Sequence, residues 1–504
     1  MAVEFLLGIV VFILIVSLFH KTKRRGNLLP GPPGLPFIGT YHKLDMKNGP
    51  YRTFQKWAKV YGKTFCCQIG MTPVIITEDF KDMDFMFRKF PAVYNGRLFD
   101  IPDEYDTQIG FANLPYGNKW KAVRSFITSL LNASNVGKKT YDTIIASEFE
   151  NVCSFIKENH RKESFNPKTL FTRSVANILI YTLFQKRYPY TGATADVEIS
   201  AVETLAETLS IEMLFVIPSY IYILARMGYL PIKSIQKLVK ASECLSKVCD
   251  ENIIGHRKDL NEDEVRDVVD ICLKQINETK ATDEKSYLTE NAVNGALTDM
   301  FSAGLVSTAL MLTWTLLLVI SNPEVKKRLA EEIASTVGFD RHPQLSDRDN
   351  MPYAKAVIQE ALRFVSVAPI GVYHKVQEDT TFKGYFLPKN TMILPNIWGL
   401  HHDPEIFPEP DKFKPERFID SKGQFMKDRR VAAFGIGGRS CPGEVLATRE
   451  IYLFLTSTVQ KFDVILTSEN VDYNGQFRGI GIYPPEYEAE FVIRKEAEKL
   501  MSRE

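Results

Sequence analysis

Cys441 has the most distinctive chemical setting in this sequence, because it lies in the run FGIGGRSCPG at residues 434–443. The glycines of this run lack Cβ atoms, so the backbone can turn tightly and bring N–H groups close to a bound atom. Pro442 is typical of the first position of a helix, which would place Cys441 at the N-cap. Unpaired N–H groups and the helix dipole favour a thiolate at that position. A thiolate in such a loop is suited to binding a soft or borderline metal ion.

Other uses of a cysteine loop fit these residues less well. A phosphatase-type loop would close its anion cradle with an arginine, but the sixth residue after Cys441 is Ala447. A zinc site would need cysteine or histidine partners at short spacing, and the sequence has none nearby. These residues alone also allow Cys441 to be a redox-sensing or nucleophilic cysteine at a helix start.

The ten residues match the haem-binding signature F-x-x-G-x-R-x-C-x-G, and on this basis the chain resembles the cytochromes P450. Further motifs follow the family's order along the chain: W-x-x-x-R (Trp120, Arg124), a central apolar helix with Ala303 and Gly304, E-x-x-R (Glu360, Arg363) and P-E-R-F (Pro415–Phe418). The resemblance is best to the microsomal animal enzymes of family two. It implies a haem-thiolate monooxygenase with a mainly α fold and a minor β region, in a single large domain after an N-terminal transmembrane helix.

The resemblance assigns cofactor-binding roles to matching positions. It makes Cys441 the axial thiolate of haem b, where it would push electron density into the iron and favour O–O cleavage. Phe434 opens the same loop. The residues implied as donors to the two haem propionates are Arg97, Trp120, Arg124, His374 and Arg439. Glu360, Arg363 and Arg417 are implied to form a buried charge network that serves folding.

The central helix departs from the family pattern where oxygen is activated. The usual continuation is A-G-x-acid-T-T, whereas this chain has AGLVST at residues 303–308. Val306 cannot carry a proton, and Ser307 keeps a hydroxyl but lacks the methyl group that limits threonine rotamers. We expect Gly304, Ser307 and Thr308 to be the catalytic residues. Gly304 itself indicates either a local opening of the helix or close helix packing.

The residues expected to form the substrate wall are apolar. They are Phe301, Ala303, Val367, Ile370 and Ile480, with 367–372 as an extended wall and 479–485 as the turn that closes the pocket. The resemblance therefore implies insertion of one oxygen atom from O2 into a steroid, terpenoid, fatty acid or xenobiotic. The alternatives are an isomerase, dehydratase or peroxygenase that acts on oxygenated lipids without redox partners, which Val306 motivates, and a non-catalytic haem sensor.

Net charge and cysteine content limit which partners and which cellular compartment are expected for this protein. A net charge of +1 argues against a nucleic-acid partner. Seven scattered cysteines indicate reduced thiols in the cytosol. Electrons are expected from NADPH through NADPH–cytochrome reductase, with cytochrome b5 as a second candidate donor. The basic patch expected to dock the acidic reductase consists of Lys119, Lys121, Arg429 and Arg430.

The apolar run Val3–Phe19 predicts a membrane anchor, because about 17 residues reach the short end of what spans a bilayer. Four basic residues follow it at 21–25, so the positive-inside rule keeps the rest of the chain in the cytosol. We expect residues 1–20 to be a single-pass anchor in the endoplasmic reticulum and residues 21–48 a basic, proline-rich hinge. Residues 49–504 would form the catalytic domain.

Three other segments carry predictions about the elements that position the site. The runs 64–68 and 73–77 alternate around a turn, which predicts a hairpin. Thr289 is a plausible N-cap for a helix that runs to Ser321, where Asn322-Pro323 stops it. Residues 147–277 are predicted to be helical, with breaks near Pro218 and at the charged run 262–267.

Overall fold

The computed structural model describes residues 8, 27–97, 110–133, 135–136, 139–159, 163–190, 196–209, 211, 229–261, 263–282 and 287–498. Apart from residue 8, the predicted anchor at residues 1–20 lies outside the described residues, as does Pro218.

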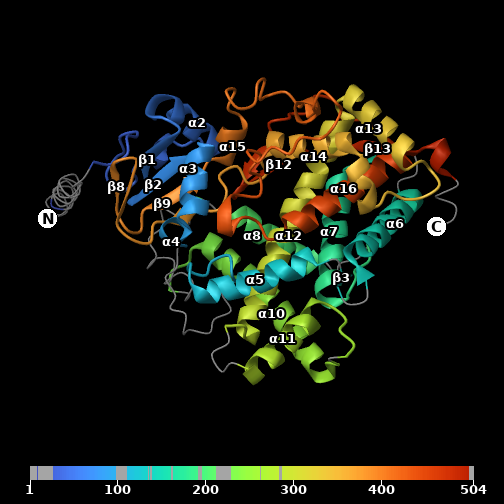
Figure 1. The fold of residues 1–504 in the computed structure, drawn as a ribbon, viewed down its shortest axis with the longest axis horizontal. Helices are drawn as coiled ribbons and strands as arrows, with labels where there is room; N and C mark the ends of the chain where they lie inside the picture. The colour runs from blue at the N-terminus through green and yellow to red at the C-terminus, as the bar shows by residue number, and fades with distance from the viewer. Residues whose placement is uncertain are drawn as a thin grey trace.

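Helices make up most of the described chain, and the prediction of a mainly α fold with a minor β region is confirmed (Figure 1). The α-helices are α2 Pro50–Tyr61, α3 Phe80–Asp84, α4 Pro91–Tyr94, α5 Asn118–Asn132, α6 Tyr141–Asn159, α7 Pro167–Phe184, α8 Asp196–Thr208, α10 Lys233–Asp259, α11 Val268–Thr282, α12 Glu290–Ile320, α13 Pro323–Thr336, α14 Pro352–Val365, α15 Ile397–His401 and α16 Glu444–Lys461. A π-helical turn, η2, spans Phe85–Lys89, and short 3-10 helices include η5 Pro415–Phe418 and η6 Gly437–Arg439.

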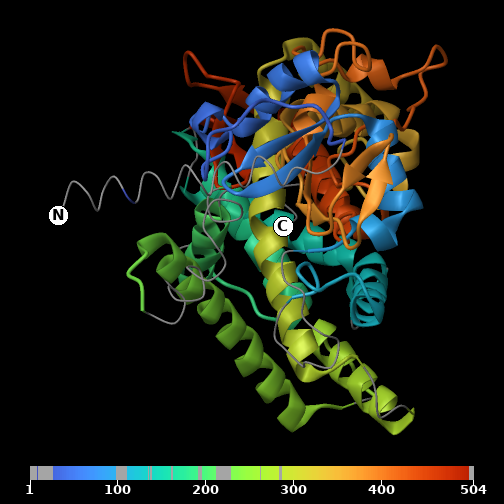
Figure 2. The ribbon, with the colours of Figure 1, turned by 90° about the vertical axis from the view of Figure 1, so that its left-hand side faces the viewer.

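Helix α12 passes through the middle of the domain, with α10 and α11 beside its N-terminal end (Figure 2). Its first residue is fixed by Thr289, whose Oγ1 accepts a hydrogen bond from the Ala292 N–H at 3.1 Å. It ends at Ile320, and Pro323 begins the next helix, so the predicted bounds are confirmed. Among the described helices it alone is long and apolar enough to cross a membrane, but it is mostly buried within the domain. It is therefore the core helix against which α7 and α16 pack.

The largest sheet joins segments from the two ends of the chain in the order β1-β2-β9-β6. The predicted hairpin is confirmed as β1 Thr64–Ile69 and β2 Thr72–Thr77, which pair antiparallel. Strand β9 Met392–Pro395 then adds parallel to β2, and β6 His374–Lys375 pairs with β9. The smaller sheets contain β3 Asn135–Val136 with β4 Lys139–Thr140, β7 Thr380–Phe382 with β8 Tyr385–Leu387, β11 Gln476–Arg478 with β12 Gly481–Tyr483, and β10 Phe462–Leu466 with β13 Ala489–Ile493 and β5 Ser164–Phe165.

The expectation of helix throughout residues 147–277 is wrong at two places. Helix α6 ends at Asn159, and the chain forms β5 before Asn166 caps α7 through its side chain and Pro167 occupies the first turn. Helix α7 ends because Gln185 adopts a left-handed conformation (φ 51°), which a helix cannot continue. The predicted break at the charged run is confirmed, since α10 ends at Asp259 and α11 begins at Val268.

The proline-rich segment is packed against β1 and is not a free spacer. The Cys66 N–H donates to the Pro30 carbonyl at 2.9 Å, and a Cβ on Gly31 would lie 1.7 Å from the Cys66 carbonyl oxygen. The Asn27 carbonyl accepts from the Phe386 N–H at 2.8 Å. From Asn27 onward the expected hinge is therefore attached to the body of the domain, and the division at residue 48 stays a prediction.

Candidate functional site

The N-cap of the helix that follows the cysteine loop lies two residues later than expected. Helix α16 begins at Glu444 with Gly443 as its N-cap, so Cys441 lies before the cap and the turn at Pro442 and Gly443 separates them. The Cys441 N–H donates to the Phe434 carbonyl at 2.7 Å, which closes the loop on itself. The prediction that Cys441 is the N-cap is wrong because Pro442 precedes the helix and does not form its first position.

Glycine is required in this loop by close packing. Gly437 has a φ of 82°, and a Cβ there would lie 2.1 Å from the Phe87 carbonyl oxygen in the π-helical turn η2. Gly435 also has a left-handed φ, of 78°. Glycine adopts such angles without the steric cost that a Cβ brings. The loop is therefore pressed against η2 in a shape that other residues would strain.

The electrostatics of Cys441 combine opposing effects. The many protein atoms around the sulfur raise the pKa of its thiol even though the residue is exposed, while the N–H groups of Gly443 and Glu444 and the charge of Arg124 lower it. The N–H groups at the helix start therefore favour the thiolate, as expected, but burial is the larger effect and the net shift of the pKa is upward. A bound metal ion would supply the missing stabilisation, because a coordinated thiol is deprotonated.

Three arginines predicted to bind propionates are drawn together from distant parts of the chain. Arg97 donates through Nε to the Ala112 carbonyl at 2.9 Å and through Nη1 to the Tyr373 carbonyl at 2.5 Å. Arg439 donates to the carbonyls of Asn95 at 2.9 Å and Leu114 at 2.7 Å. Arg124, on α5, donates to the Ser440 carbonyl beside Cys441. Trp120 lies one turn before Arg124, and its ring is 4.5 Å from the Arg439 guanidinium.

The charges of this cluster are not balanced by the described part of the chain, where no carboxylate forms an ion pair with Arg97, Arg124 or Arg439. Burial, together with the charges of Arg97 and Arg124, lowers the pKa of Arg439 to about 8. Burial chiefly lowers the pKa of Arg97, to about 10. The Nη1 atom of Arg439 is buried and has no hydrogen-bond partner among the described residues. Buried, mutually repelling cations with a spare donor fit a group that brings two carboxylates, as haem b does.

His374 lies beside this cluster in a fixed tautomer. The Asn95 amide nitrogen donates to the Phe87 carbonyl at 3.1 Å, so its Oδ1 faces His374 Nδ1 at 2.9 Å and accepts from it. The ring also stacks on Phe87 with 3.9 Å between centroids. Burial, and then the charges of Arg97 and Arg439, hold the pKa of His374 well below its usual range. The ring is therefore neutral with a bare Nε2, and it must gain a proton before Nε2 can donate to a propionate.

The predicted oxygen-side residues lie along one stretch of α12. Ala303 and Ser307 are exposed and one turn apart, so they share a face of a helix that is otherwise largely buried. Ser307 Oγ donates to the Ala303 carbonyl at 2.7 Å, which leaves its lone pairs available to accept from water. Thr308 is buried. A Cβ on Gly304 would lie 3.2 Å from the Leu179 side chain of α7, so Gly304 allows close helix packing, and its catalytic role stays a prediction.

The predicted substrate residues are only partly gathered. The Ile482 N–H donates to the Val367 carbonyl at 2.9 Å, which brings half-buried Val367 next to the turn that contains Ile480. Ile370 is buried, and Phe301 is only 1% exposed within the core. Residues 367–370 form bends and a turn, not the extended wall that was expected. Val372, which the sequence argument did not assign, is 50% exposed at the end of this segment.

Glu360, Arg363 and Arg417 form a buried ion-pair network behind the cysteine loop. Glu360 accepts from Arg363 at 2.7 and 2.8 Å and from Arg417 Nε at 3.0 Å. The Glu360 carboxylate also accepts from the Lys414 N–H at 2.9 Å. Every oxygen of the carboxylate is thus hydrogen-bonded, which is the condition under which a buried ion pair is tolerated.

Two functional positions escaped the sequence argument. Asn95 orients both His374 and Arg439, and only its place next to Gly96 and Arg97 could have drawn attention to it. Asp299 on α12 accepts from the Ala112 N–H at 2.8 Å, and a Cβ on Gly110 would lie 2.1 Å from its carboxyl group. Burial raises the pKa of Asp299 to about 7. Asp299 therefore ties the segment that carries Ala112, a partner of Arg97, to the central helix.

The predicted basic patch is smaller than expected. Lys119 is only 5% exposed, because it lies on the inner face of α5, so it cannot contribute to a docking surface. Arg430 is exposed but forms a close pair with Asp428 at 2.6 Å. Lys121 and Arg429 are exposed.

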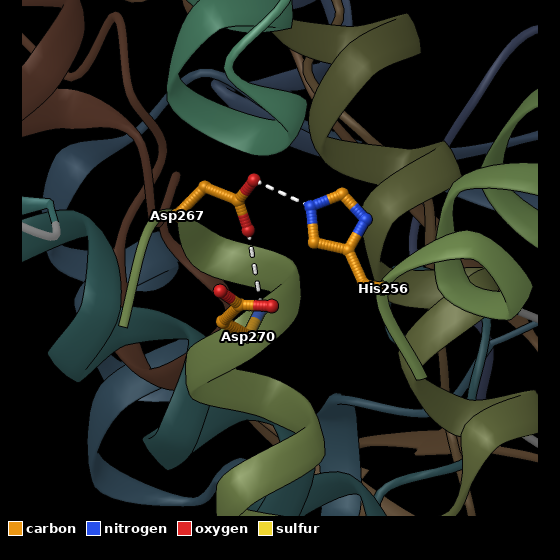
Figure 3. A group of neighbouring side chains, drawn as sticks. All are labelled: His256, Asp267 and Asp270. Carbon is orange, nitrogen blue, oxygen red and sulfur yellow. Dashed lines mark hydrogen bonds and ion pairs between the residues drawn. The ribbon is translucent and has the colours of Figure 1, made fainter. Parts of the chain in front are cut away.

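A second group with metal-ligand chemistry lies where α10 meets α11. His256, Asp267 and Asp270 place ligand atoms within 4.8 Å of one another (Figure 3). However, His256 Nδ1 contacts the Asn252 carbonyl at 2.8 Å and Nε2 contacts Asp267 at 2.7 Å, and Arg266 donates to both oxygens of Asp270. The Asp267 hydrogen bond chiefly raises the pKa of His256. These atoms are engaged with one another and with Arg266, so the group is a charged clip between two helices.

Comparisons with known proteins agree with this geometry. A family model described as Cytochrome P450 matches residues 29–491. The chain is 32% identical to cytochrome P450 2D26 of Mus musculus over 467 residues, which covers 90% of each chain. It is 32% identical to cytochrome P450 2E1 of Mesocricetus auratus, covering 94% of this chain and 95% of the relative. It is 29% identical to cytochrome P450 2C11 of Rattus norvegicus, covering 97% of each.

The cysteine loop and the unbalanced cation cluster lie within the matched residues, and together they suit haem b: Cys441 would ligate the iron, and Arg97, Arg124 and Arg439 would hold the carboxylates. Haem supplies the oxidising chemistry when bound, and the protein supplies ligation, orientation and proton delivery. From the proline-rich segment to the last strand, this chain belongs to the cytochrome P450 family and is a haem-thiolate monooxygenase.

Proposed function

We propose that this monooxygenase inserts one atom of O2 into a lipophilic substrate, using electrons from NADPH that a flavoprotein reductase delivers. The observation that carries this proposal is the exposed face of α12, where Ala303 and Ser307 lie one turn apart within an otherwise buried helix. An alanine and a serine there leave room for a substrate and for water. The site needs room for the substrate that is oxidised, and it needs water because protons must reach the reacting oxygen.

Ser307 holds a water in this proposal. Its hydroxyl hydrogen is used by the Ala303 carbonyl, so the oxygen accepts a hydrogen bond from the water and does not itself give up a proton at rest. Val306 is half-buried and offers no acid. Proton delivery therefore depends on ordered water, and we expect reductase-driven turnover to be slow and to release reduced oxygen species.

The substrate class follows from the side chains available to line the site. Ala303, Val367, Val372 and Ile480 are apolar and at least partly exposed. An apolar wall binds its ligand by removing hydrocarbon surface from water, at about 25 cal/mol per Å². A steroid, terpenoid, fatty acid or lipophilic xenobiotic has that surface.

The electron donor is proposed to dock through Lys121 and Arg429, which are exposed and belong to segments expected near the cysteine side of the site. Opposite charge on an acidic reductase would mainly raise the rate of encounter. Cytochrome b5 has the same requirement for a basic surface and is the second proposed donor. Charge reversal at both positions should slow reduction most at low ionic strength, and equal rates at low salt would contradict this docking site.

The location proposed for the enzyme is the cytosolic face of the endoplasmic reticulum, with one anchor at residues 1–20. Apolar side chains of Leu35, Phe37, Ile38 and Met71 are 39–50% exposed close to the start of the described chain. Exposed apolar groups gathered there are suited to a membrane surface. Protease added to sealed microsomes should degrade the domain, and protection of the domain would overturn the topology.

Turnover with and without NADPH distinguishes the proposal from its main alternative. A lipid panel would be incubated with NADPH and reductase, and in parallel with lipid hydroperoxides alone. A monooxygenase should form product only in the first assay, whereas a rearranging enzyme, which Val306 favours, should consume hydroperoxides without NADPH. Val306→Asp should raise the product formed per NADPH consumed, while Val306→Asn, of the same shape but without an acid, should not.

A further inference from the structure

His401, the last residue of α15, is a fully buried histidine whose two ring nitrogens are both engaged. Its Nε2 accepts from the Ala432 backbone N–H at 2.8 Å, and its Nδ1 lies 2.7 Å from Ser366 Oγ. Because a backbone N–H can only donate, Nε2 must be unprotonated and Nδ1 must carry the hydrogen. Ser366 accepts that hydrogen and donates its own to the Arg363 carbonyl at 3.0 Å. The ring is therefore neutral, in a single tautomer.

The same histidine is joined to the buried ion-pair network through its backbone. Arg363 Nη1 donates to the His401 carbonyl at 2.9 Å, while Arg363 is itself held by Glu360. Burial, and then the charge of Arg363, keep the pKa of His401 well below its usual range. Neither the backbone nor the ring of His401 can shift without breaking a buried hydrogen bond.

On its other side His401 touches the segment that leads into the cysteine loop. Ala432 is buried, and its carbonyl accepts from the Gly435 N–H at 2.8 Å. Phe434, between them, presents the carbonyl that accepts the Cys441 N–H at 2.7 Å. Hydrogen bonds thus link Glu360, Arg363 and His401 to Ala432, and the turn that follows Ala432 carries the partner of Cys441.

We propose that His401 is a positioning residue for the thiolate ligand. Its Nε2 lone pair fixes the Ala432 amide, and through the turn at 432–435 it sets the direction of the Phe434 carbonyl and of the Cys441 amide. The direction of the backbone N–H groups around a ligating sulfur tunes how much negative charge that sulfur keeps. A substitution at His401 should therefore change the position and charge of the Cys441 sulfur, although His401 does not contact that sulfur.

Three variants test this role. His401→Phe keeps a planar ring but removes both hydrogen bonds. His401→Gln places an amide oxygen where it can accept from Ala432. The matched control is His402→Phe, because His402 is also buried, with its pKa lowered to about 3 chiefly by burial, but its ring stacks on Trp398 at 4.1 Å and its Nδ1 contacts the Trp398 carbonyl. None of the described hydrogen bonds of the His402 side chain reaches the cysteine loop.

Two readouts are needed, and neither depends on catalysis. In His401→Phe, amide hydrogen exchange across residues 432–441 should accelerate at least tenfold, and part of the reduced carbon monoxide complex should change from the thiolate-type to the thiol-type spectrum. His401→Gln should restore both, and His402→Phe should resemble the wild type in both. Wild-type exchange and spectrum in His401→Phe would overturn the proposal, as would equal losses in His402→Phe or no rescue by glutamine.

Should His401→Phe fail to fold, Ser366→Ala decides the question. It removes the acceptor that fixes the tautomer while leaving the ring in place. Exchange at 432–441 should then increase by a smaller factor in the same direction, and unchanged exchange would reject the role proposed for His401.

Discussion

Two groups of buried and half-buried arginines lie in this domain, and they differ in which negative charges balance them. Arg363 and Arg417 share the carboxylate of Glu360, and every member of that network is paired. Arg97, Arg124 and Arg439 contact backbone carbonyls and repel one another, and within the part of the chain that the structure describes one nitrogen of Arg439 has no hydrogen-bond partner. A balanced group contributes to the folded chain as it stands. An unbalanced group is stabilised only when an anion binds, so charge balance separates a folding feature from a binding site.

The largest expected effect comes from removing the negative charge that Glu360 supplies to Arg363 and Arg417. Glu360→Gln keeps the side-chain shape but leaves Arg363 and Arg417 without a counter-charge in a site where Glu360 and Arg363 are fully buried. We expect a loss of about 3–5 kcal/mol in the free energy of unfolding, because an uncompensated buried charge is costly. Denaturant unfolding measures it. Glu409→Gln, which removes a carboxylate from an exposed pair of lysines, is the control and should change little.

Removing one cation from the unbalanced group should weaken haem binding without destabilising the haem-free protein. Arg124→Gln keeps a donor for the Ser440 carbonyl but removes a charge. Transfer of haem to a heme-scavenging apoprotein should become about tenfold faster, since a charge-assisted hydrogen bond is lost. The unfolding midpoint of the haem-free protein should not fall. Lys121→Gln, an exposed lysine on the same helix, should leave both unchanged.

The same imbalance predicts how haem retention depends on pH. His374 is neutral in the cluster and must bind a proton before its Nε2 can donate to a propionate. The haem-bound protein therefore carries more protons than the haem-free protein, so affinity should fall as pH rises, by up to about tenfold per pH unit for each proton. His374→Gln should abolish this dependence, because glutamine binds no proton. A flat profile in the wild type would contradict this.

The smallest expected effect is at His256, which carries a charge opposite to that of Asp267 only when its ring is protonated. The pKa of His256 is raised by Asp267, so the clip between α10 and α11 is at full strength below the unfolded pKa of about 6.5 and is lost as pH rises through the folded pKa. Hydrogen exchange at residues 252–270 should therefore accelerate with pH by more than the intrinsic rate does. The excess should correspond to a loss of less than about 1 kcal/mol in the free energy of local opening. His256→Gln should remove this excess. His42→Asn, at an exposed position, should not.

Features with a local sequence signal were predictable, and those made by distant contacts were not. Cys441 and the bounds of α12 depend on glycines, a threonine cap and a proline within a few residues, so the sequence indicates them directly. The burial of Lys119 and the end of α7 at Gln185 depend on tertiary packing and a single left-handed residue. His401 was invisible because its partner Ala432 lies 31 residues away, and a lone histidine carries no pattern.

The pairing of β2 with β9 has a consequence for how the chain is made. Glu78, directly after β2, bonds Asn396, directly after β9, and the two residues are 318 positions apart. Ribosomes add about 5–20 residues per second, so roughly 15–60 seconds separate the synthesis of these strands. During that time the hairpin presents the open edge of β2, with the apolar run Val74-Ile75-Ile76, to its surroundings. The first-made part of the sheet must therefore be protected from other unpaired strands until nearly four-fifths of the protein has been translated.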